Sequence, residues 1–194
     1  MAANGSILRM IRRLSPTVAL VAIVIIAGCT PREPAVPFDE STTVVAIGDS
    51  IMVGASEHLT GLVDGIVIDA EVGRHFADGI AALERRNVPT DPPDILVVAL
   101  GTNAGTNAAR IDELINAAGD VNEIILVNVR VPRGWESSTN TALADAAARH
   151  DNVRIVDWYG ESANGDHLFR ADGYHPNETG SERWANLIVV EIKS

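Results

Sequence analysis

Two segments of the sequence combine residue types that carry nucleophilic catalysis. Ser50 closes the tripeptide Gly48-Asp49-Ser50, and Asp172 stands three residues before His175 near the end of the chain. A serine hydroxyl is a weak nucleophile until a base takes its proton, histidine is the usual base, and a carboxylate orients the imidazole. Each segment alone is weak evidence, because Ser50 could cap a helix and an Asp before Gly is common in turns.

Short apolar runs alternate with longer stretches of helical periodicity from about residue 42 onwards. The runs rich in Val, Ile and Leu are residues 43–47, 65–70, 95–100, 124–129 and 153–156. Such continuous runs are typical of parallel strands buried on both faces. The helical candidates are residues 51–60, 77–86, 108–118, 140–150 and 178–192. The alternation predicts one α/β domain, a three-layer α/β/α sandwich with about five parallel strands.

Polar residues directly after the apolar runs are the candidates for function. In open parallel sheets, ligands bind outside the carboxyl ends of the strands. The candidate segments are residues 48–50 after the first run, 72–75 after the second, 101–103 after the third, 130–136 after the fourth and 172–176 before the last helix.

The order of these segments resembles the four sequence blocks of the SGNH (GDSL-like) hydrolase family. The resemblance spans Val44 to about Ile192 and implies a flavodoxin-like α/β fold with serine esterase chemistry. Its blocks are Gly48-Asp49-Ser50, Gly73 after the second run, Gly101-Thr102-Asn103, and Asp172-Gly173-Tyr174-His175.

The resemblance also implies a role for each matching residue. Ser50 would be the nucleophile, His175 its base and Asp172 the carboxylate that orients the imidazole. The backbone N–H groups of Ser50 and Gly73 and the side-chain amide of Asn103 would form the oxyanion hole. The alternatives are a plain turn glycine for Gly73 and an Asx-turn residue for Asn103.

A finer resemblance is to the extracellular SGNH domain of bacterial peptidoglycan O-acetyltransferases. It rests on residues 69–75 (DAEVGRH), 127–136 (VNVRVPRGWE) with Asn140, 157–159 (DWY) and 172–177 (DGYHPN). It implies that Arg74, Arg130, Arg133 and Trp135 line the mouth of the site, where Trp135 could stack on a sugar ring and an Arg could pair with a carboxylate. The alternative is a set of solvated arginines and a partly buried Trp. In those proteins the domain follows a membrane acyltransferase domain, so a separate membrane acyltransferase is an expected partner.

The first 30 residues have the pattern of an export signal. Arg9, Arg12 and Arg13 precede the apolar run 18–27, which is about half the roughly 20 residues that cross a bilayer. The run ends in Ile26-Ala27-Gly28-Cys29, which resembles the lipobox that precedes a lipidated cysteine. We therefore expect a signal peptide at residues 1–28, a lipid on Cys29, a Pro-rich tether at 29–41 and the catalytic domain at 42–194. An ordinary signal peptide, an uncleaved anchor and a start at Met10 are alternatives.

The charge balance excludes some classes of partner. Twenty-six Asp and Glu against 15 Lys and Arg give a net charge of −11, which repels phosphate backbones and makes nucleic acid an unexpected ligand. The sequence lacks the Gly-Lys-Ser/Thr ending of a P-loop, a His-Glu-x-x-His motif and paired cysteines. We expect no metal and no organic cofactor.

These observations predict an extracytoplasmic serine esterase or acyltransferase, lipid-anchored to the bacterial cell membrane. Its substrates would be small acyl esters or acetylated cell-wall glycan, with transfer and hydrolysis sharing one acyl-enzyme. The alternative is a catalytically silent glycan-binding or scaffolding lipoprotein that works with a membrane acyltransferase.

Overall fold

The computed structural model describes Met1 and residues 38–194. The predictions for the export signal, for Cys29 and for the tether up to residue 37 therefore lie outside the described residues. Phe38 already packs against the core of the domain, and its ring lies 5.3 Å from the Lys193 ammonium. None of the helices between residues 38 and 194 has the length and hydrophobicity needed to cross a bilayer.

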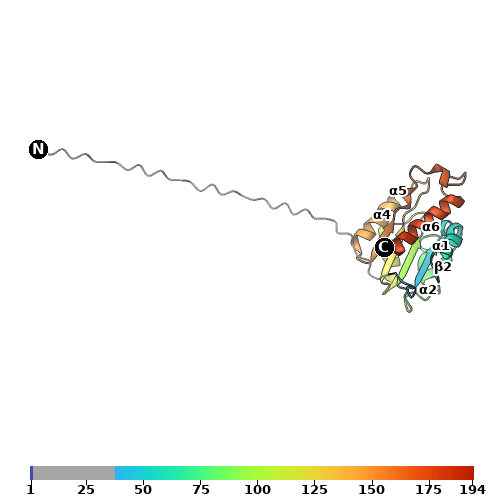
Figure 1. Cartoon of the computed structure of the whole chain (residues 1–194), viewed down its shortest axis with the longest axis horizontal. Helices are drawn as coiled ribbons and strands as arrows, with labels where there is room; N and C mark the ends of the chain where they lie inside the picture. Colours follow the sequence, from blue (N-terminus) through green and yellow to red (C-terminus); the bar gives the residue numbers. More distant parts are fainter. Residues whose placement is uncertain (2–37) are drawn as a thin grey trace. The chain divides into compact units, whose positions relative to one another are not determined.

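Strands and helices alternate along the described chain, as Figure 1 shows in sequence colours. The elements are β1 (Val44–Gly48), α1 (Ser50–Leu62), β2 (Val67–Ala70), α2 (Asp78–Arg85), β3 (Ile95–Ala99), α3 (Ala108–Ala118), β4 (Glu123–Val127), α4 (Glu136–Arg149), β5 (Val153–Val156), α5 (Trp158–Glu161), the 3₁₀ turn η1 (Asp166–Leu168) and α6 (Glu178–Ile192).

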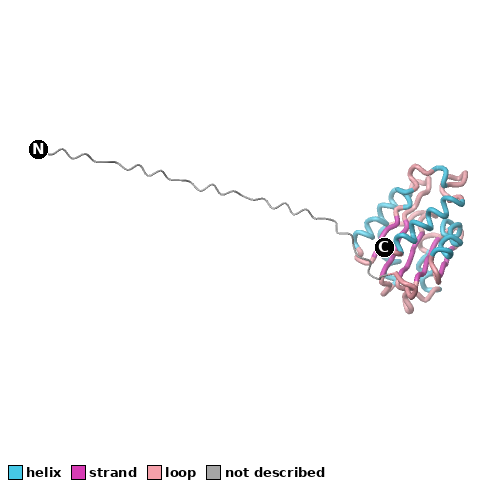
Figure 2. Tube along the Cα trace, in the orientation of Figure 1, coloured by secondary structure: helices cyan, strands magenta, loops and turns pink. Residues whose placement is uncertain are grey.

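The five strands form one parallel sheet in the order β2-β1-β3-β4-β5. Figure 2 shows them as a single magenta layer between cyan helices. The register aligns Gly48 at the end of β1 with Ala70 of β2 and Ala99 of β3. The segments that follow these three strands therefore meet at one edge of the sheet. The prediction of an α/β sandwich with five parallel strands is confirmed.

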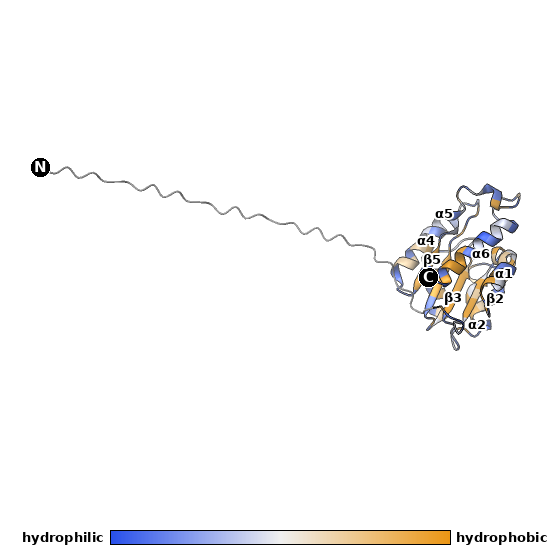
Figure 3. Ribbon diagram, viewed as in Figure 1, coloured by the Kyte–Doolittle hydropathy of each residue, from blue (hydrophilic) through white to orange (hydrophobic). Residues whose placement is uncertain are grey.

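Two apolar cores lie on the two faces of the sheet. Successive side chains of a strand point to opposite faces, so Val97 of β3 packs towards α1 and α6, while Leu96 and Val98 pack towards α2, α3 and α4. In Figure 3, the orange that marks hydrophobic residues is concentrated on the strands. Burial on both faces explains why the strands are continuous apolar runs rather than alternating ones.

Three local features differ from the sequence expectation. Helix α4 begins at Glu136, four residues before the predicted start, because its polar first turn shows no apolar periodicity. Helix α5 has four residues and η1 has three, which is too short to produce a periodic pattern. Strand β2 begins at Val67, two residues late, since Gly65 adopts a φ of 73° and forms a turn.

Candidate active site

The turn between β1 and α1 presents Ser50. The side chain of Asp49 accepts a hydrogen bond of 3.0 Å from the backbone N–H of Ile51, so Asp49 is the N-cap and Ser50 is the first helical residue. Asp49 is buried, and its backbone N–H donates to the carbonyl of Ala99 in β3. Since Asp49 fills the capping role, the hydroxyl of Ser50 is available for another partner.

The structure brings Ser50, His175 and Asp172 together in one hydrogen-bonded row. The Ser50 hydroxyl lies 3.0 Å from His175 Nε2, and His175 Nδ1 lies 2.9 Å from a carboxylate oxygen of Asp172. A carboxylate beside Nδ1 places the proton on that nitrogen and leaves Nε2 free to accept from the hydroxyl. This is the arrangement in which an imidazole can act as a general base towards a serine.

The Asp172 carboxylate is held in its ionised form. Its other oxygen accepts hydrogen bonds from the backbone N–H groups of His175, at 3.0 Å, and Tyr174, at 3.1 Å. The His175 backbone N–H, with further help from its imidazole and from the Tyr174 N–H, lowers the pKa of Asp172 to about 2. The carboxylate is thus available to stabilise an imidazolium at His175.

The loop that carries Asp172 and His175 is fixed by its own backbone. The Arg170 N–H donates to the His175 carbonyl over 2.8 Å, and the Arg170 carbonyl accepts from the N–H of Gly173, whose φ is 80°. Asn177 then caps α6 by accepting from the Gly180 N–H. Both residues are therefore presented by a short, closed turn anchored to a long helix.

The expected oxyanion donors come from the ends of three neighbouring strands. Ser50 follows β1, Gly73 follows β2 and Asn103 follows β3. One N–H of the Asn103 amide donates to the Arg74 carbonyl over 3.2 Å, which fixes the amide against the segment that carries Gly73. Gly73 has a φ of 79°, and a Cβ there would meet no atom within 4 Å. The positive φ is therefore the reason for a glycine here, since a side chain would meet no steric obstacle.

Arg74, which was expected at the mouth of the site, lies buried beneath it. Its guanidinium donates to the Gly48 carbonyl over 3.2 Å and to the backbone and side chain of Asp69, each over 2.5 Å. These bonds join the carboxyl ends of β1 and β2 directly under the Ser50 turn. In this place Arg74 supports the site rather than contacting a ligand.

Arg130 and Arg133 lie at different depths beside aromatic rings. The Arg130 guanidinium sits 5.8 Å from the ring centres of both Tyr159 and Phe169 and donates to a backbone carbonyl of α5's C-cap. The Arg133 guanidinium lies 5.9 Å from the ring of Tyr174, which in turn lies 4.2 Å from the His175 ring. Arg133 is thus connected to the cluster of Ser50, His175 and Asp172 through Tyr174, whereas Arg130 packs against the α5 segment.

Trp135 is half-buried against the loop that contains Asn103. A Cβ at Gly105 would lie 2.9 Å from Trp135 Cβ and Cδ1, so the indole packs directly on this glycine. Its Nε1 is buried and has no hydrogen-bond partner within the described residues. Trp135 therefore stabilises the loop around Asn103, in addition to any contact with a ligand.

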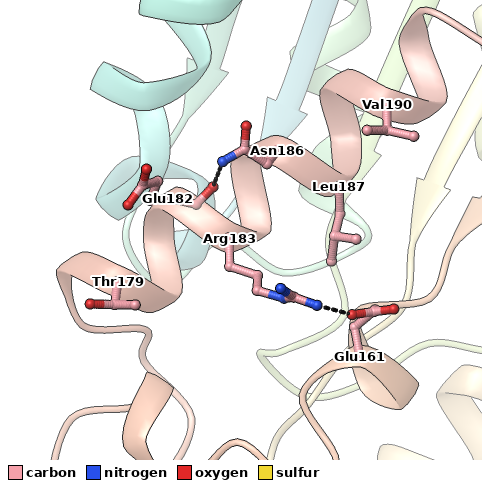
Figure 4. A pocket seen from close by; sticks show the side chains of 7 residues that line it. All are labelled: Glu161, Thr179, Glu182, Arg183, Asn186, Leu187 and Val190. Carbon is pink, nitrogen blue, oxygen red and sulfur yellow. Dashed lines mark hydrogen bonds and ion pairs between the residues drawn. The ribbon is translucent and has the colours of Figure 1, made fainter.

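Two cavities differ in their relation to the cluster. One, of about 270 Å³, opens beside Ser50 and is lined by Ser50, Ile51, Val53, Gly54, Val72, Arg170, His175 and Pro176. The other, of about 370 Å³, is drawn in Figure 4 and lies along α6, where Arg183 pairs with Glu161 over 2.5 Å. The second contains none of the three clustered residues, so the first is the better candidate for substrate.

Sequence reasoning missed several residues that shape the site. Tyr174 lies inside the last motif but was given no role, and Arg170 lies two residues before that motif. The amide of Asn128, just after β4, donates to Asp157, just after β5, over 2.7 Å, and its oxygen accepts from the Tyr159 N–H. The signal was available, since both residues follow the carboxyl end of a strand. Within the described residues, no group of three His, Cys, Asp or Glu side chains could hold a metal ion.

The amino-acid sequence of the chain is similar to that of known proteins. No protein-family model matches the chain. Over 158 residues, 81% of this chain, it is 35% identical to YrhL of Bacillus subtilis and 34% identical to the peptidoglycan O-acetyltransferase OatA of Listeria monocytogenes. The chain spans about a quarter of the length of these relatives, 25% in each case.

Solved structures share the fold. The C-terminal catalytic domain of OatA from Streptococcus pneumoniae matches with a TM-score of 0.68 and 18% identity, over 78% of this chain and 94% of that domain. The chain has the SGNH-hydrolase fold and is homologous to peptidoglycan O-acetyltransferases. A carbohydrate esterase of family 3 from Talaromyces cellulolyticus has the same SGNH fold, with a TM-score of 0.58 and 22% identity over 78% of this chain and 96% of that one.

Proposed function

We propose that the chain is a serine esterase or O-acetyltransferase that cleaves or transfers small acyl groups, chiefly O-acetyl, on cell-wall glycan. The observation that carries this proposal is the hydrogen-bonded row of Ser50, His175 and Asp172, with 3.0 Å and 2.9 Å between successive polar atoms. The homologous peptidoglycan O-acetyltransferases support the substrate class.

In the proposed reaction, the Ser50 oxygen attacks the ester carbonyl while its proton moves to His175 Nε2. The carbonyl oxygen gains the negative charge and is stabilised by the N–H groups of Ser50 and Gly73 and by the free N–H of the Asn103 amide. Each such donor typically contributes about 2.7–4 kcal/mol to the transition state. Asp172 stabilises the imidazolium that forms.

The tetrahedral intermediate then collapses to an acyl-enzyme. The carbon–oxygen bond to the alcohol breaks, and His175 returns its proton to the leaving oxygen. In the second half, His175 removes a proton from an incoming hydroxyl, which attacks the acyl carbon. The bond between the acyl carbon and the Ser50 oxygen then breaks, and His175 returns the proton to that oxygen. Water as the incoming group gives hydrolysis, and a sugar hydroxyl gives transfer.

We further propose an extracytoplasmic site of action at the membrane surface. The lipobox-like Ile26-Ala27-Gly28-Cys29 supports a lipid anchor on Cys29, and each buried methylene of an acyl chain adds roughly 0.8 kcal/mol to membrane binding. An anchored domain could receive acyl groups from a separate membrane acyltransferase. Mass spectrometry that finds Cys29 unmodified in the membrane fraction would refute the anchor.

The proposed function is tested by acyl release from an O-acetylated aryl ester and from O-acetylated glycan. The full chain is compared with its Ser50→Ala variant, in the presence and absence of acceptor sugars. We expect release that depends on Ser50, and acetylated acceptor if transfer competes with hydrolysis. Glycan binding without release of any acyl group would instead favour a binding or scaffolding role.

A further inference from the structure

Arg170 borders the cavity beside Ser50 and carries an unpaired guanidinium. Every other arginine or lysine within residues 38–194 has a hydrogen bond, an ion pair or an aromatic ring contact, whereas the Arg170 side chain has none. This is unexpected in a chain with 26 acidic residues and a net charge of −11. A cation left without a partner beside a nucleophile is positioned for an anionic ligand.

The backbone of Arg170 is fixed relative to the base. Its N–H donates to the His175 carbonyl over 2.8 Å, and its carbonyl accepts from the Gly173 N–H over 2.9 Å. The Arg170 backbone is therefore held beside His175, although the guanidinium at the end of the side chain is exposed. Substituting the side chain leaves both backbone bonds in place.

The position of His175 indicates which half of the ester enters the cavity. Since the imidazole must return a proton to the leaving oxygen, the alcohol half has to lie on the side that His175 lines. The cavity of about 270 Å³ is far larger than the two carbons of an acetyl group require. Val53, Val72 and Pro176 form apolar walls, and Arg170 supplies the positive end.

The charges around the cavity favour an anion. No acidic residue is among the described residues that line it. Two carboxylates next in sequence to this lining have partners of their own, because Asp172 holds His175 and Glu178 lies 3.3 Å from His58. Helix α1 also directs its N-terminus, the positive end of its dipole, towards the Ser50 side of the cavity.

We infer that Arg170 is a specificity-determining residue that binds a carboxylate on the alcohol half of the ester. The inference rests on the proposed function and deepens it: the preferred substrate is an acidic sugar ester rather than a neutral one. A guanidinium binds a carboxylate through two parallel N–H···O bonds, which gives both direction and affinity.

The test compares two probes that differ by one charge, an O-acetylated methyl hexuronoside with a free carboxylate and the same compound as its primary amide. The full chain is assayed beside Arg170→Gln, Arg170→Lys and Arg110→Gln. Arg110 is a matched control, since it pairs with Glu113 on α3 and its loss changes the net charge equally. We expect the acid-to-amide ratio of kcat/KM to fall about tenfold in Arg170→Gln, to recover partly in Arg170→Lys and to stay unchanged in Arg110→Gln.

Two results would overturn the inference. If Arg170→Gln keeps the full preference for the acid probe, Arg170 does not bind the carboxylate. If Arg170→Gln lowers kcat/KM equally on both probes, Arg170 instead positions the loop. If the chain turns over neither probe, Ser50-dependent release from the aryl ester and the glycan decides the proposed function, and binding decides the inference alone. Calorimetry on Ser50→Ala should then show tighter binding of the acid probe than of the amide probe. The Ser50→Ala/Arg170→Gln double variant should lack this preference. Equal affinities of Ser50→Ala for the two probes would refute the inference.

Discussion

The ionised state of Asp172 depends on the hydrogen bonds that its carboxylate accepts. Its carboxylate accepts from the backbone N–H of His175 and Tyr174 and faces the imidazole at 2.9 Å, and its pKa is lowered to about 2. Asp172 therefore stays ionised above about pH 3, and any acid limb of the activity above that pH belongs to another group.

The lowered pKa of Asp172 also predicts how stability depends on pH. A carboxylate whose pKa falls from 3.8 to about 2 on folding stabilises the native state above pH 3.8, and this contribution is lost as pH falls through about 2. The unfolding free energy of the wild-type chain minus that of Asp172→Asn should therefore shrink between about pH 5 and pH 2. Urea titrations at several pH values measure it; a difference that grows on acidification contradicts the assignment.

Asn103 gives a second prediction at the scale of one side chain. Asn103→Ala should reduce kcat by about 10²–10³-fold with little change in KM, because the amide stabilises charge that develops only in the transition state. Steady-state kinetics on an aryl acetate check this. Asn116→Ala on α3 is the control, since Asn116 lies away from the cluster and should leave kcat unaffected.

At the scale of elements, the β1–α1 turn combines capping of α1 with presentation of Ser50, the proposed nucleophile. Asp49 caps α1 through a hydrogen bond of 3.0 Å, as Asn107 caps α3 through 3.1 Å to the Arg110 N–H. Asp49→Ala and Asn107→Ala should each lower the unfolding free energy by about 1 kcal/mol. Only Asp49→Ala should also lower kcat, because α1 begins at Ser50.

Asp49→Asn separates the two roles of this residue. Its amide oxygen can still accept from the Ile51 N–H, so the helix cap should persist while the carboxyl group is removed. Chemical denaturation and kinetics should then find the variant nearer to wild type than Asp49→Ala. A variant as impaired as Asp49→Ala in both measurements would show that the carboxyl group, rather than the cap, is what matters.

At the scale of the whole molecule, the sheet separates two cores that share no side chain. Leu96 and Ile124 are register partners on the α3 face, and Val97 lies on the opposite face. Leu96→Ala should cost about 2–5 kcal/mol of unfolding free energy. In double-mutant cycles with Leu96→Ala, the coupling to Ile124→Val should exceed the coupling to Val97→Ala, since only Ile124 contacts the same core. Equal couplings would contradict two separate cores.

Most of the architecture was predictable from the sequence. Strands of a buried parallel sheet consist of continuous apolar runs, and helices of ten or more residues show a clear periodicity of apolar residues. The resemblance to SGNH hydrolases also predicted that Ser50, His175 and Asp172 would meet, although only Ser50 directly follows a strand. The depth of a side chain was beyond that reasoning. Arg74, Arg130 and Arg133 all lie in polar segments that follow a strand, so the sequence does not distinguish them. Three-dimensional packing nevertheless buries Arg74 beneath β1 and β2 and leaves Arg133 beside Tyr174.

Ser50 and His175 are separated by 125 positions, and the contact between them depends on α6 packing beside α1, as seen in Figure 1. During synthesis, a chain that has grown only as far as Phe169 already contains the proposed nucleophile but lacks its proposed base, His175. Its serine would be an ordinary alcohol, inert towards esters. Reactivity would therefore arise in a single late step, when the last helix docks, and the first hydrolysed ester would report that the domain has finished folding.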